Sequence, residues 1–196
     1  MNVHFKACGG LTYNETLDRL VADGSVSLRG LKENAKVYDE MILDVNTDYF
    51  EQHGGYKFAG EFYEEAYRFA CKLYGEQNIL SAVMHADEIN LALTEKYGYP
   101  VYHYHLHIVA LPVVEKQVLW SKRCKDKALV GTVKETVQQV SHSKKWKSQR
   151  ALDEQGRPAV DDKGRPKYIP SYSILQDEFC RHMREAGFTD FVRGER

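Results

Sequence analysis

The densest group of potentially reactive side chains lies between residues 85 and 107. The chain reads His85-Ala-Asp-Glu88 and then, after a short insert, His103-Tyr-His-Leu-His107. Alternate side chains of a β-strand point to the same face, so the three histidines of the second segment would share one face. Imidazole is the commonest metal-ligating side chain, and several imidazoles on one surface favour a divalent metal site. A metal-dependent enzyme is therefore the first hypothesis.

The expected metal ligands are His85, at the end of one strand, and His105 and His107, on a second strand. Three protein ligands leave coordination positions open for substrate oxygens, which suits Lewis-acid polarisation of a phosphodiester. Glu88 lies three residues after His85, and it could orient a ligand or bind the metal directly. One strand rarely supplies three ligands to one ion, so we expect His103 to flank the site or to face bound DNA. The alternative is a structural set of histidines that are hydrogen-bonded to tyrosines.

Hydrophobic periodicity predicts the elements that must position these side chains. Helices are expected at 13–21, 58–74, 90–97, 132–140 and 174–186, and strands at 41–45, 78–85 and 101–112. The helix at 58–74 is the clearest, because its apolar residues recur every three or four positions. In strand 101–112 the histidines lie on one face and mostly apolar residues on the other, as in an antiparallel sheet. The order of elements predicts an α+β fold in which the two histidine-bearing strands are neighbours.

Composition indicates an ordinary soluble protein with one domain over residues 1–196. The hydrophobic fraction is 43% and the charged fraction 28%, and no apolar run is long enough for a membrane span. The N-terminus does not resemble a signal peptide. The four cysteines are scattered and form no CxxC pair, so we expect free thiols in a reducing cytoplasm.

The net charge of −1 conceals a basic segment. Residues 116–167 contain 14 Lys and Arg against 6 Asp and Glu, a net charge of +8 beside a body of −9. Such a segment favours a polyanionic partner, although a solvated charged surface is the alternative. Cations hold phosphates, and an aromatic ring among them can stack on an unpaired base. The candidate contacts in its centre are Lys144, Lys145, Trp146, Lys147 and Arg150.

A short near-repeat follows this cluster. Segments 153–158 and 161–166 each end in Gly-Arg-Pro. Glycine and proline at these spacings predict turns, so residues 150–170 should form a polar β-ribbon or a mobile loop. The repeat is too short to indicate a repeat architecture.

Several collinear segments resemble one known family. His85-Ala-Asp-Glu88 matches an H-x-D-E motif, and 105–112 looks like the histidine strand that ends in a proline. The weaker matches are Val26-Ser-Leu-Arg29 with Ala35 and Asp39-Glu40, Leu119-Trp-Ser-Lys122, Gly187-Phe188, and Arg193-Gly194-Glu195. Over residues 20–196 the chain thus resembles the Mob/Pre (MobV-type) plasmid mobilisation and recombination relaxases, a branch of the HUH endonucleases.

The resemblance implies an HUH fold, in which helices flank a central antiparallel sheet that is often five-stranded. It implies nicking of one DNA strand at an origin of transfer with Mn²⁺ or Mg²⁺, for conjugative mobilisation or plasmid recombination. Single-stranded or supercoiled origin DNA would be the partner, with accessory mobilisation proteins, and the chain would be an N-terminal part of a longer protein. Arg29, Lys122 and Arg123 join the expected DNA contacts.

Two features depart from the family pattern. An insert at 89–102 separates the two histidine motifs, and it should loop out without moving the ligands. The N-terminal H-N-x-R-type motif that holds the family's nucleophile is missing, which leaves His4 and Tyr13 as the candidates. Tyr102 and Tyr104 should face away from the histidines. One alternative is a non-catalytic DNA-binding module that retains the metal site, and another is a metal hydrolase of small molecules, against which the basic segment argues.

Overall fold

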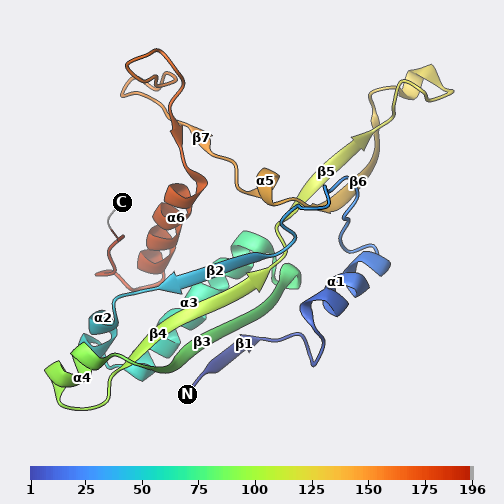
Figure 1. Cartoon of the computed structure of the whole chain (residues 1–196). Coiled ribbons are helices and arrows are strands. Elements are labelled where there is room, and N and C mark those ends of the chain that lie inside the picture. The colour runs from blue at the N-terminus through green and yellow to red at the C-terminus, as the bar shows by residue number, and fades with distance from the viewer. Residues whose placement is uncertain (195–196) are drawn as a thin grey trace.

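A four-stranded antiparallel sheet in the order β1-β3-β4-β2 forms the centre of the molecule (Figure 1). The computed structural model describes residues 1–194, so Glu195 of the C-terminal element lies outside the described residues. The sheet consists of β1 (Val3–Lys6), β2 (Asp39–Asp44), β3 (Ile79–Ile89) and β4 (Tyr102–Ala110). The helices are α1 (Tyr13–Ala22), α2 (Thr47–Gln52), α3 (Tyr56–Tyr74), α4 (Leu91–Tyr97), α5 (His142–Lys145) and α6 (Ser171–Glu185). The α+β fold predicted from the sequence is therefore confirmed.

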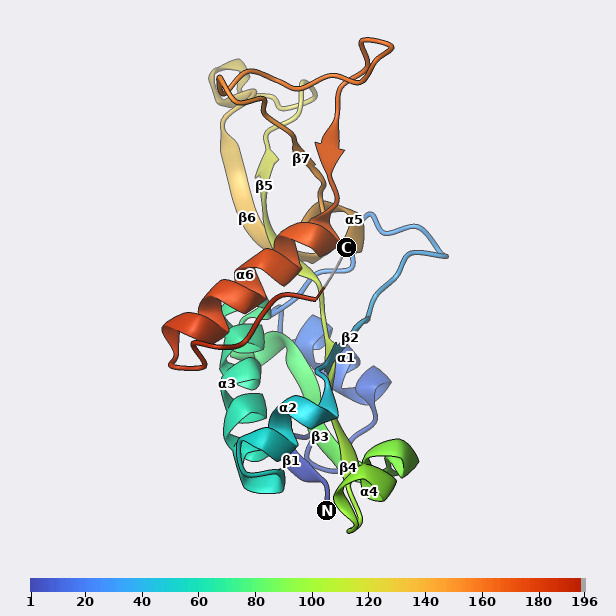
Figure 2. The ribbon, with the colours of Figure 1, turned by 90° about the vertical axis from the view of Figure 1, so that its left-hand side faces the viewer.

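The main core lies between one face of the sheet and helix α3. Ala59, Phe62, Ala66 and Phe69 recur at helical spacing along α3, and they are buried against the sheet. Their partners on β3 and β4 alternate with the histidines, so this face is apolar. Helix α6 packs beside α3 and closes the same side of the sheet (Figure 2). Each fully buried aromatic ring of this core stabilises the fold by about 1.5–3 kcal/mol.

A smaller cluster covers one end of the opposite face. Val109 follows His107 by two residues and so shares its face, and it packs with Leu17 of α1 and with Leu111. A capping box, formed between Thr12 and Glu15, starts α1. At the other end of this face, the insert forms helix α4 at the tip of the β3–β4 hairpin (Figure 1). The stretch between α1 and α4 holds the histidines.

The strand β3 is longer than the sequence predicts. The pairing with β4 continues past His85 to Ile89↔Tyr102, with an irregularity between His85 and Glu88. The insert therefore extends the hairpin before it turns into α4. Asp48 of α2 holds α4 in place, because it accepts hydrogen bonds from Lys96 at 2.7 Å and from Tyr97 at 2.8 Å.

The helix predicted at 132–140 is wrong. Residues Val133–Val140 form strand β6, which pairs antiparallel with β5 (Val113–Leu119). The β-branched residues Val133, Thr136 and Val137 favour extended backbone, and the neighbouring strand supplies the hydrogen bonds that they need. This two-stranded ribbon projects from the body (Figure 1).

A second arm spans residues 149–169 and projects from the same side of the body (Figures 1 and 2). Strands β7 (Gln149–Arg150) and β8 (Tyr168–Ile169) pair at its base. Beyond them the two near-repeats form similar turns, in which Asp153 and Asp161 accept backbone N–H groups of their own turn. Among the helices in residues 1–194, none combines the length and the apolar composition that a bilayer crossing requires.

Candidate metal centre

Three imidazoles meet on the face of the sheet that α3 does not cover. His85 on β3 is directly opposite His105 on β4, and Val83 is opposite His107. The ring centroids of His85 and His105 are 5.2 Å apart, those of His85 and His107 5.0 Å, and those of His105 and His107 4.9 Å. The antiparallel register thus brings together the side chains proposed from the sequence as ligands.

His105 is the most buried member of this group. The residue is only 8% exposed, and its Nδ1 is buried without a hydrogen-bond partner. Burial lowers the pKa of His105 below its ordinary value, and the neighbouring His107 and His103 lower it further. A neutral imidazole with an unpaired nitrogen lone pair is the form in which histidine binds a metal. A buried nitrogen without a hydrogen-bond partner destabilises the folded state, and a bound cation would supply the missing partner of His105 Nδ1.

The donor set fits a transition-metal ion better than a hard alkaline-earth ion. Imidazole nitrogens suit first-row transition metals, whereas Mg²⁺ prefers an octahedron of oxygens. Within residues 1–194, no three His, Cys, Asp or Glu side chains already have their donor atoms converged on one point. The rings of His85 and His105 are stacked with an interplanar angle of 17°. Ligation by both rings would therefore require side-chain rotation.

Carboxylates border the histidines on both sides. On β2, an oxygen of Glu40 lies 3.6 Å from His107 Nδ1, and an oxygen of Asp44 lies 3.4 Å from His103 Nε2. Glu88 lies opposite His103 across the β3–β4 pair. Carboxylates at such positions can orient ligating histidines and raise their basicity. The sequence analysis did not identify Glu40 and Asp44 as site residues. The available signal was their spacing of four residues, which places both carboxylates on the same face of a strand.

His103 is held by neighbours on both sides. Its Nδ1 lies 3.0 Å from the buried Thr47 hydroxyl, and its Nε2 faces Asp44. Both ring nitrogens therefore have protein partners, which distinguishes His103 from His105. The structure places it at the α4 end of the histidine row, 5.1 Å from the His105 ring.

Both candidate nucleophiles border the same face of the sheet. His4 is opposite Val83, which in turn is opposite His107, so these side chains lie in one row across the sheet. Tyr13 lies on the stripe of α1 that also carries the buried Leu17, and its side chain is 40% exposed beside the Tyr38 ring. Tyr104 is buried in the core on the opposite face.

The candidate DNA contacts divide into free and engaged side chains. Lys122 and Arg123 are exposed at the turn of the β5–β6 ribbon, and Lys147 and Arg150 are exposed near the base of the second arm. Arg29 forms an ion pair with Glu135 at 3.3 Å. These side chains are accessible to a polyanion.

Three others, like Arg29, have protein partners. Lys144 donates to Gln139, and Lys145 donates to the Leu73 carbonyl at 2.6 Å. Burial lowers the pKa of Lys145 below its ordinary value. The Trp146 indole N–H donates to the buried Asp39, so this ring is anchored to the body of the protein. DNA contact through these side chains stays a prediction.

The fold of the sheet and its helices is shared with solved relaxase domains. Over 99% of its length the chain matches solved structures of the MobM relaxase domain (MOBV; Mob_Pre) bound to plasmid pMV158 oriT DNA, one of them Mn-bound, with a TM-score of 0.54. The match covers 70% of the Mn-bound chain at 18% identity and 79% of a second one at 19%. Such low identity establishes a shared fold.

The family profile of the plasmid recombination enzymes (Mob_Pre) matches residues 1–173, and the chain belongs to this family. A Staphylococcus aureus plasmid recombination enzyme type 2 is 30% identical over 89 residues, which are 44% of this chain and 20% of the relative. A Lactiplantibacillus plantarum plasmid recombination enzyme is 20% identical over 166 residues, which are 85% of this chain and 40% of the relative. The chain thus spans between a fifth and two fifths of the length of these relatives.

Proposed function

We propose that this chain is the DNA-nicking domain of a relaxase, which cuts one strand at an origin of transfer by metal-assisted transesterification. The observation that carries the proposal is the trio His85, His105 and His107 on the open face of the sheet, with the orphaned His105 nitrogen among them. Membership of the plasmid recombination enzyme family and the fold shared with oriT-bound relaxase domains support it. Conjugative mobilisation or plasmid recombination would be the process served.

The three histidines would hold a divalent cation, Mn²⁺ in preference to Mg²⁺. When bound, the cation would supply Lewis-acid polarisation of the scissile phosphate. Glu88 would orient His105, whose surroundings it influences electrostatically. Glu40 would do the same for His107, since its carboxylate lies within 3.6 Å of that ring.

The nucleophile is His4 or Tyr13, because both lie at the border of the histidine face. Its nitrogen or oxygen forms a bond to phosphorus while the bond from phosphorus to the 3′-oxygen breaks. The attacking group gives up one proton and the 3′-oxygen takes up one as it leaves as a hydroxyl, so the protons balance and the 5′-phosphate stays on the protein. The covalent link conserves the energy of the phosphodiester, so the 3′-hydroxyl can later reverse the step.

The DNA would reach this face from the side of the basic segment. Both arms project from one side of the body, and Lys122 and Arg123 lie at the turn of the β5–β6 ribbon (Figure 1). Contacts to phosphates contribute affinity without sequence information. Accessory mobilisation proteins would complete the complex at the origin. The four free cysteines fit a reducing cytoplasm as the place of action.

A thermal-shift titration with Mn²⁺ tests the metal centre. We expect Mn²⁺ to raise the melting temperature of the wild type and not of His105→Ala or His107→Ala, because only the folded wild type holds the ion. His53→Ala is the matched control, since His53 caps the end of α2 and pairs with Asp190. A wild type that Mn²⁺ leaves unchanged, even with a single-stranded origin oligonucleotide present, would contradict the ligand set.

Cleavage of a 5′-labelled and a 3′-labelled oligonucleotide then tests the chemistry. We expect a protein–DNA adduct that carries the 3′-proximal fragment, and its loss in either His4→Ala or Tyr13→Phe identifies the nucleophile. A phosphohistidine adduct hydrolyses in acid, whereas a phosphotyrosine adduct survives it, which gives an independent readout. Metal and DNA binding without any adduct would instead support a DNA-binding module that has lost catalysis.

A further inference from the structure

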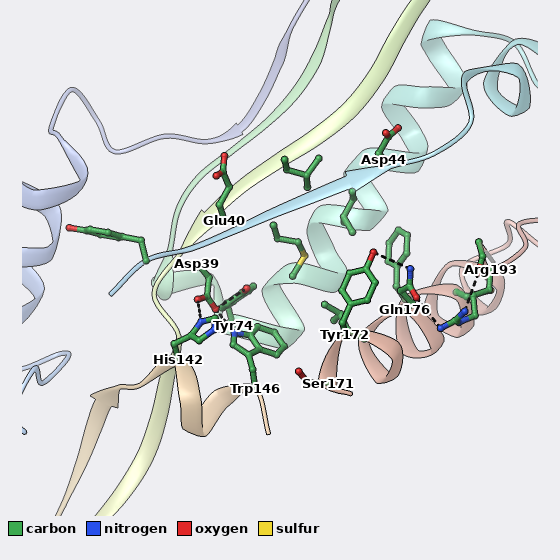
Figure 3. A pocket seen from close by; sticks show the side chains of 18 of the residues that line it. Asp39, Glu40, Asp44, Tyr74, His142, Trp146, Ser171, Tyr172, Gln176 and Arg193 are labelled. Carbon is green, nitrogen blue, oxygen red and sulfur yellow. Dashed lines mark hydrogen bonds and ion pairs between the residues drawn. The ribbon is translucent and has the colours of Figure 1, made fainter. Parts of the chain in front are cut away.

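A groove lies outside the histidine face, along the outer edge of β2. It has a volume of about 750 Å³, within the range of ligand-binding clefts. Strand β2 forms one wall and helix α6 the other, and Tyr74, His142 and Trp146 close one end (Figure 3). Among the residues that line this groove, the proposed nicking reaction uses only Glu40, whose side chain faces His107.

The wall formed by β2 has unpaired backbone groups. The strand is at the edge of the sheet and pairs only with β4. Apart from that pairing, no hydrogen bond within residues 1–194 engages the backbone of Asp39–Asp44. Alternate residues of such a strand present N–H and C=O groups outward, which is the template for an added strand.

The floor of the groove is apolar, and the hydrophobic side chains of β2 that face it alternate along the strand. Met41 and Leu43 point from β2 into the side of the sheet that α6 covers, and Leu175 and Phe179 face them from the helix. An extended peptide that pairs with β2 would place every second side chain on these residues. Tyr172 lies at the mouth of the groove and is 67% exposed.

The charges along the β2 edge favour a basic ligand. Of the two cations that line the groove, Lys36 precedes β2 and Arg193 is paired with Asp177. Glu40 and Asp44 point from β2 to the face opposite the groove floor, where they would flank alternate residues of an added strand (Figure 3).

Asp39 is already bonded to His142, at 2.5 Å, and to Trp146, so the closed end is rigid. The side chains of Glu40 and Asp44 on the same edge strand are 64% and 58% exposed. Each charged side chain of β2 is thus a carboxylate. A nucleic acid phosphate would be repelled there, whereas a lysine or arginine would be attracted.

We infer that this groove binds an extended segment of a partner protein by strand addition to β2, with apolar residues at alternate positions and basic residues between them. The six residues of β2 span about 20 Å, so a segment of about six residues fills the edge. Backbone hydrogen bonds would give affinity, and the Met41–Leu175 floor would select the side chains. The groove would tether a second protein beside the metal centre without covering it.

Fluorescence anisotropy with a labelled hexapeptide tests this inference. The probe is an acetylated peptide of alternating lysine and valine. Two comparison peptides are measured beside it: a glutamate–valine peptide, and the lysine–valine peptide with alternate amides N-methylated. We expect binding of the first peptide, and at least about tenfold weaker binding of the N-methylated one, which cannot form the ladder. The glutamate peptide should bind more weakly still, with the difference shrinking as salt increases.

Leu175→Lys places a cation on the floor of the groove, and Leu91→Lys makes the same change on the exposed α4. We expect peptide binding to be lost in the first variant and retained in the second, with melting curves as a check on folding. The N-methylated peptide tests the inference on the wild type alone. Failure of the lysine–valine peptide to bind below about 1 mM overturns it, as does indifference to N-methylation.

Two other occupants give distinct results. Self-association that depends on concentration and disappears in Leu175→Lys would assign the groove to a second copy of the chain. Competition by a single-stranded oligothymidylate for the peptide would assign it to DNA. Either result overturns the inference, and neither bears on the Mn²⁺ response of the histidines.

Discussion

Asp39 connects the sheet to the centre of the basic segment, and its replacement should weaken the whole domain. The carboxylate is buried and accepts hydrogen bonds from His142, Trp146 and, at 3.3 Å, from the Tyr74 hydroxyl. Burial, with Asp39 as a further cause, raises the pKa of Tyr74 well above its ordinary value, so this hydroxyl stays a donor. Asp39→Asn keeps the shape of the side chain and replaces one acceptor oxygen by an N–H₂ donor.

The magnitude follows from the bond that is lost. An amide oxygen in the place of Oδ2 can still accept from Trp146 and Tyr74, but the amide N–H₂ in the place of Oδ1 cannot accept from His142. One bond to a buried carboxylate is therefore lost, at about 1.5–3 kcal/mol. A loss of about 2 kcal/mol in the free energy of unfolding lowers the melting temperature by about 4–8 °C in a domain of this length. Asp18→Asn, on the exposed side of α1, should change the free energy by less than about 0.5 kcal/mol.

Urea denaturation of the two variants and the wild type measures the difference. Trp120 and Trp146 are the two tryptophans, so a Trp120→Phe background isolates the fluorescence of Trp146. Its emission should shift in Asp39→Asn, because the indole then donates to a neutral amide and not to a carboxylate. If Asp39→Asn is as stable as Asp18→Asn and the emission does not move, the reasoning on this network is refuted.

Three further outcomes are expected. Binding of single-stranded DNA should weaken as the salt concentration rises. The double variant Lys122→Ala/Arg123→Ala should reduce the slope of log K against log salt concentration by about 2, whereas Lys57→Ala on α3 should leave this slope unchanged. Equal slopes in the double variant and the wild type would show that the ribbon does not contact the DNA. Burial lowers the pKa of His105, so on acidification the unfolded chain takes up this proton before the folded protein does. The free energy of unfolding that this residue contributes above about pH 6.5 should therefore be lost as the pH falls through the folded-state pKa. In urea denaturation, the free energy of unfolding of His105→Gln should fall less between about pH 7 and pH 5 than that of the wild type. Asp48→Ala should speed amide hydrogen exchange in α4 and leave exchange in α3 as it was, because Lys96 and Tyr97 lose their shared partner; unchanged exchange in α4 would mean that packing alone holds the insert.

The sequence predicted the histidine cluster because its signal is local. Alternation in 103–107 indicated a strand with one histidine face, and the register of β3 against β4 confirms that His85 and His105 are neighbours. Helices α1, α3, α4 and α6 could also be predicted from the sequence, since each has an apolar stripe or residues typical of a helix end.

What the sequence could not predict depends on pairing between distant segments. Glu40 and Asp44 border the histidines only because β2 pairs with β4 in one register, and a shift of one residue would turn both away. The bond between Asp39 and His142 joins residues 103 positions apart. Strand β6 was mistaken for a helix, because its extended form depends on β5 and not on its own periodicity.

The central sheet separates two sets of evolutionary constraints. Met84, Leu106 and Ile108 on one face hold α3 and α6, whereas His85 and His107 one residue away face the open side. Substitutions of the histidines and their neighbours on the open face, between α1 and α4, therefore leave the packing of α3 and α6 intact. A lineage could retune its metal or its DNA target through one set of alternate residues while the other set keeps the protein folded, which makes this sheet tolerant of functional divergence.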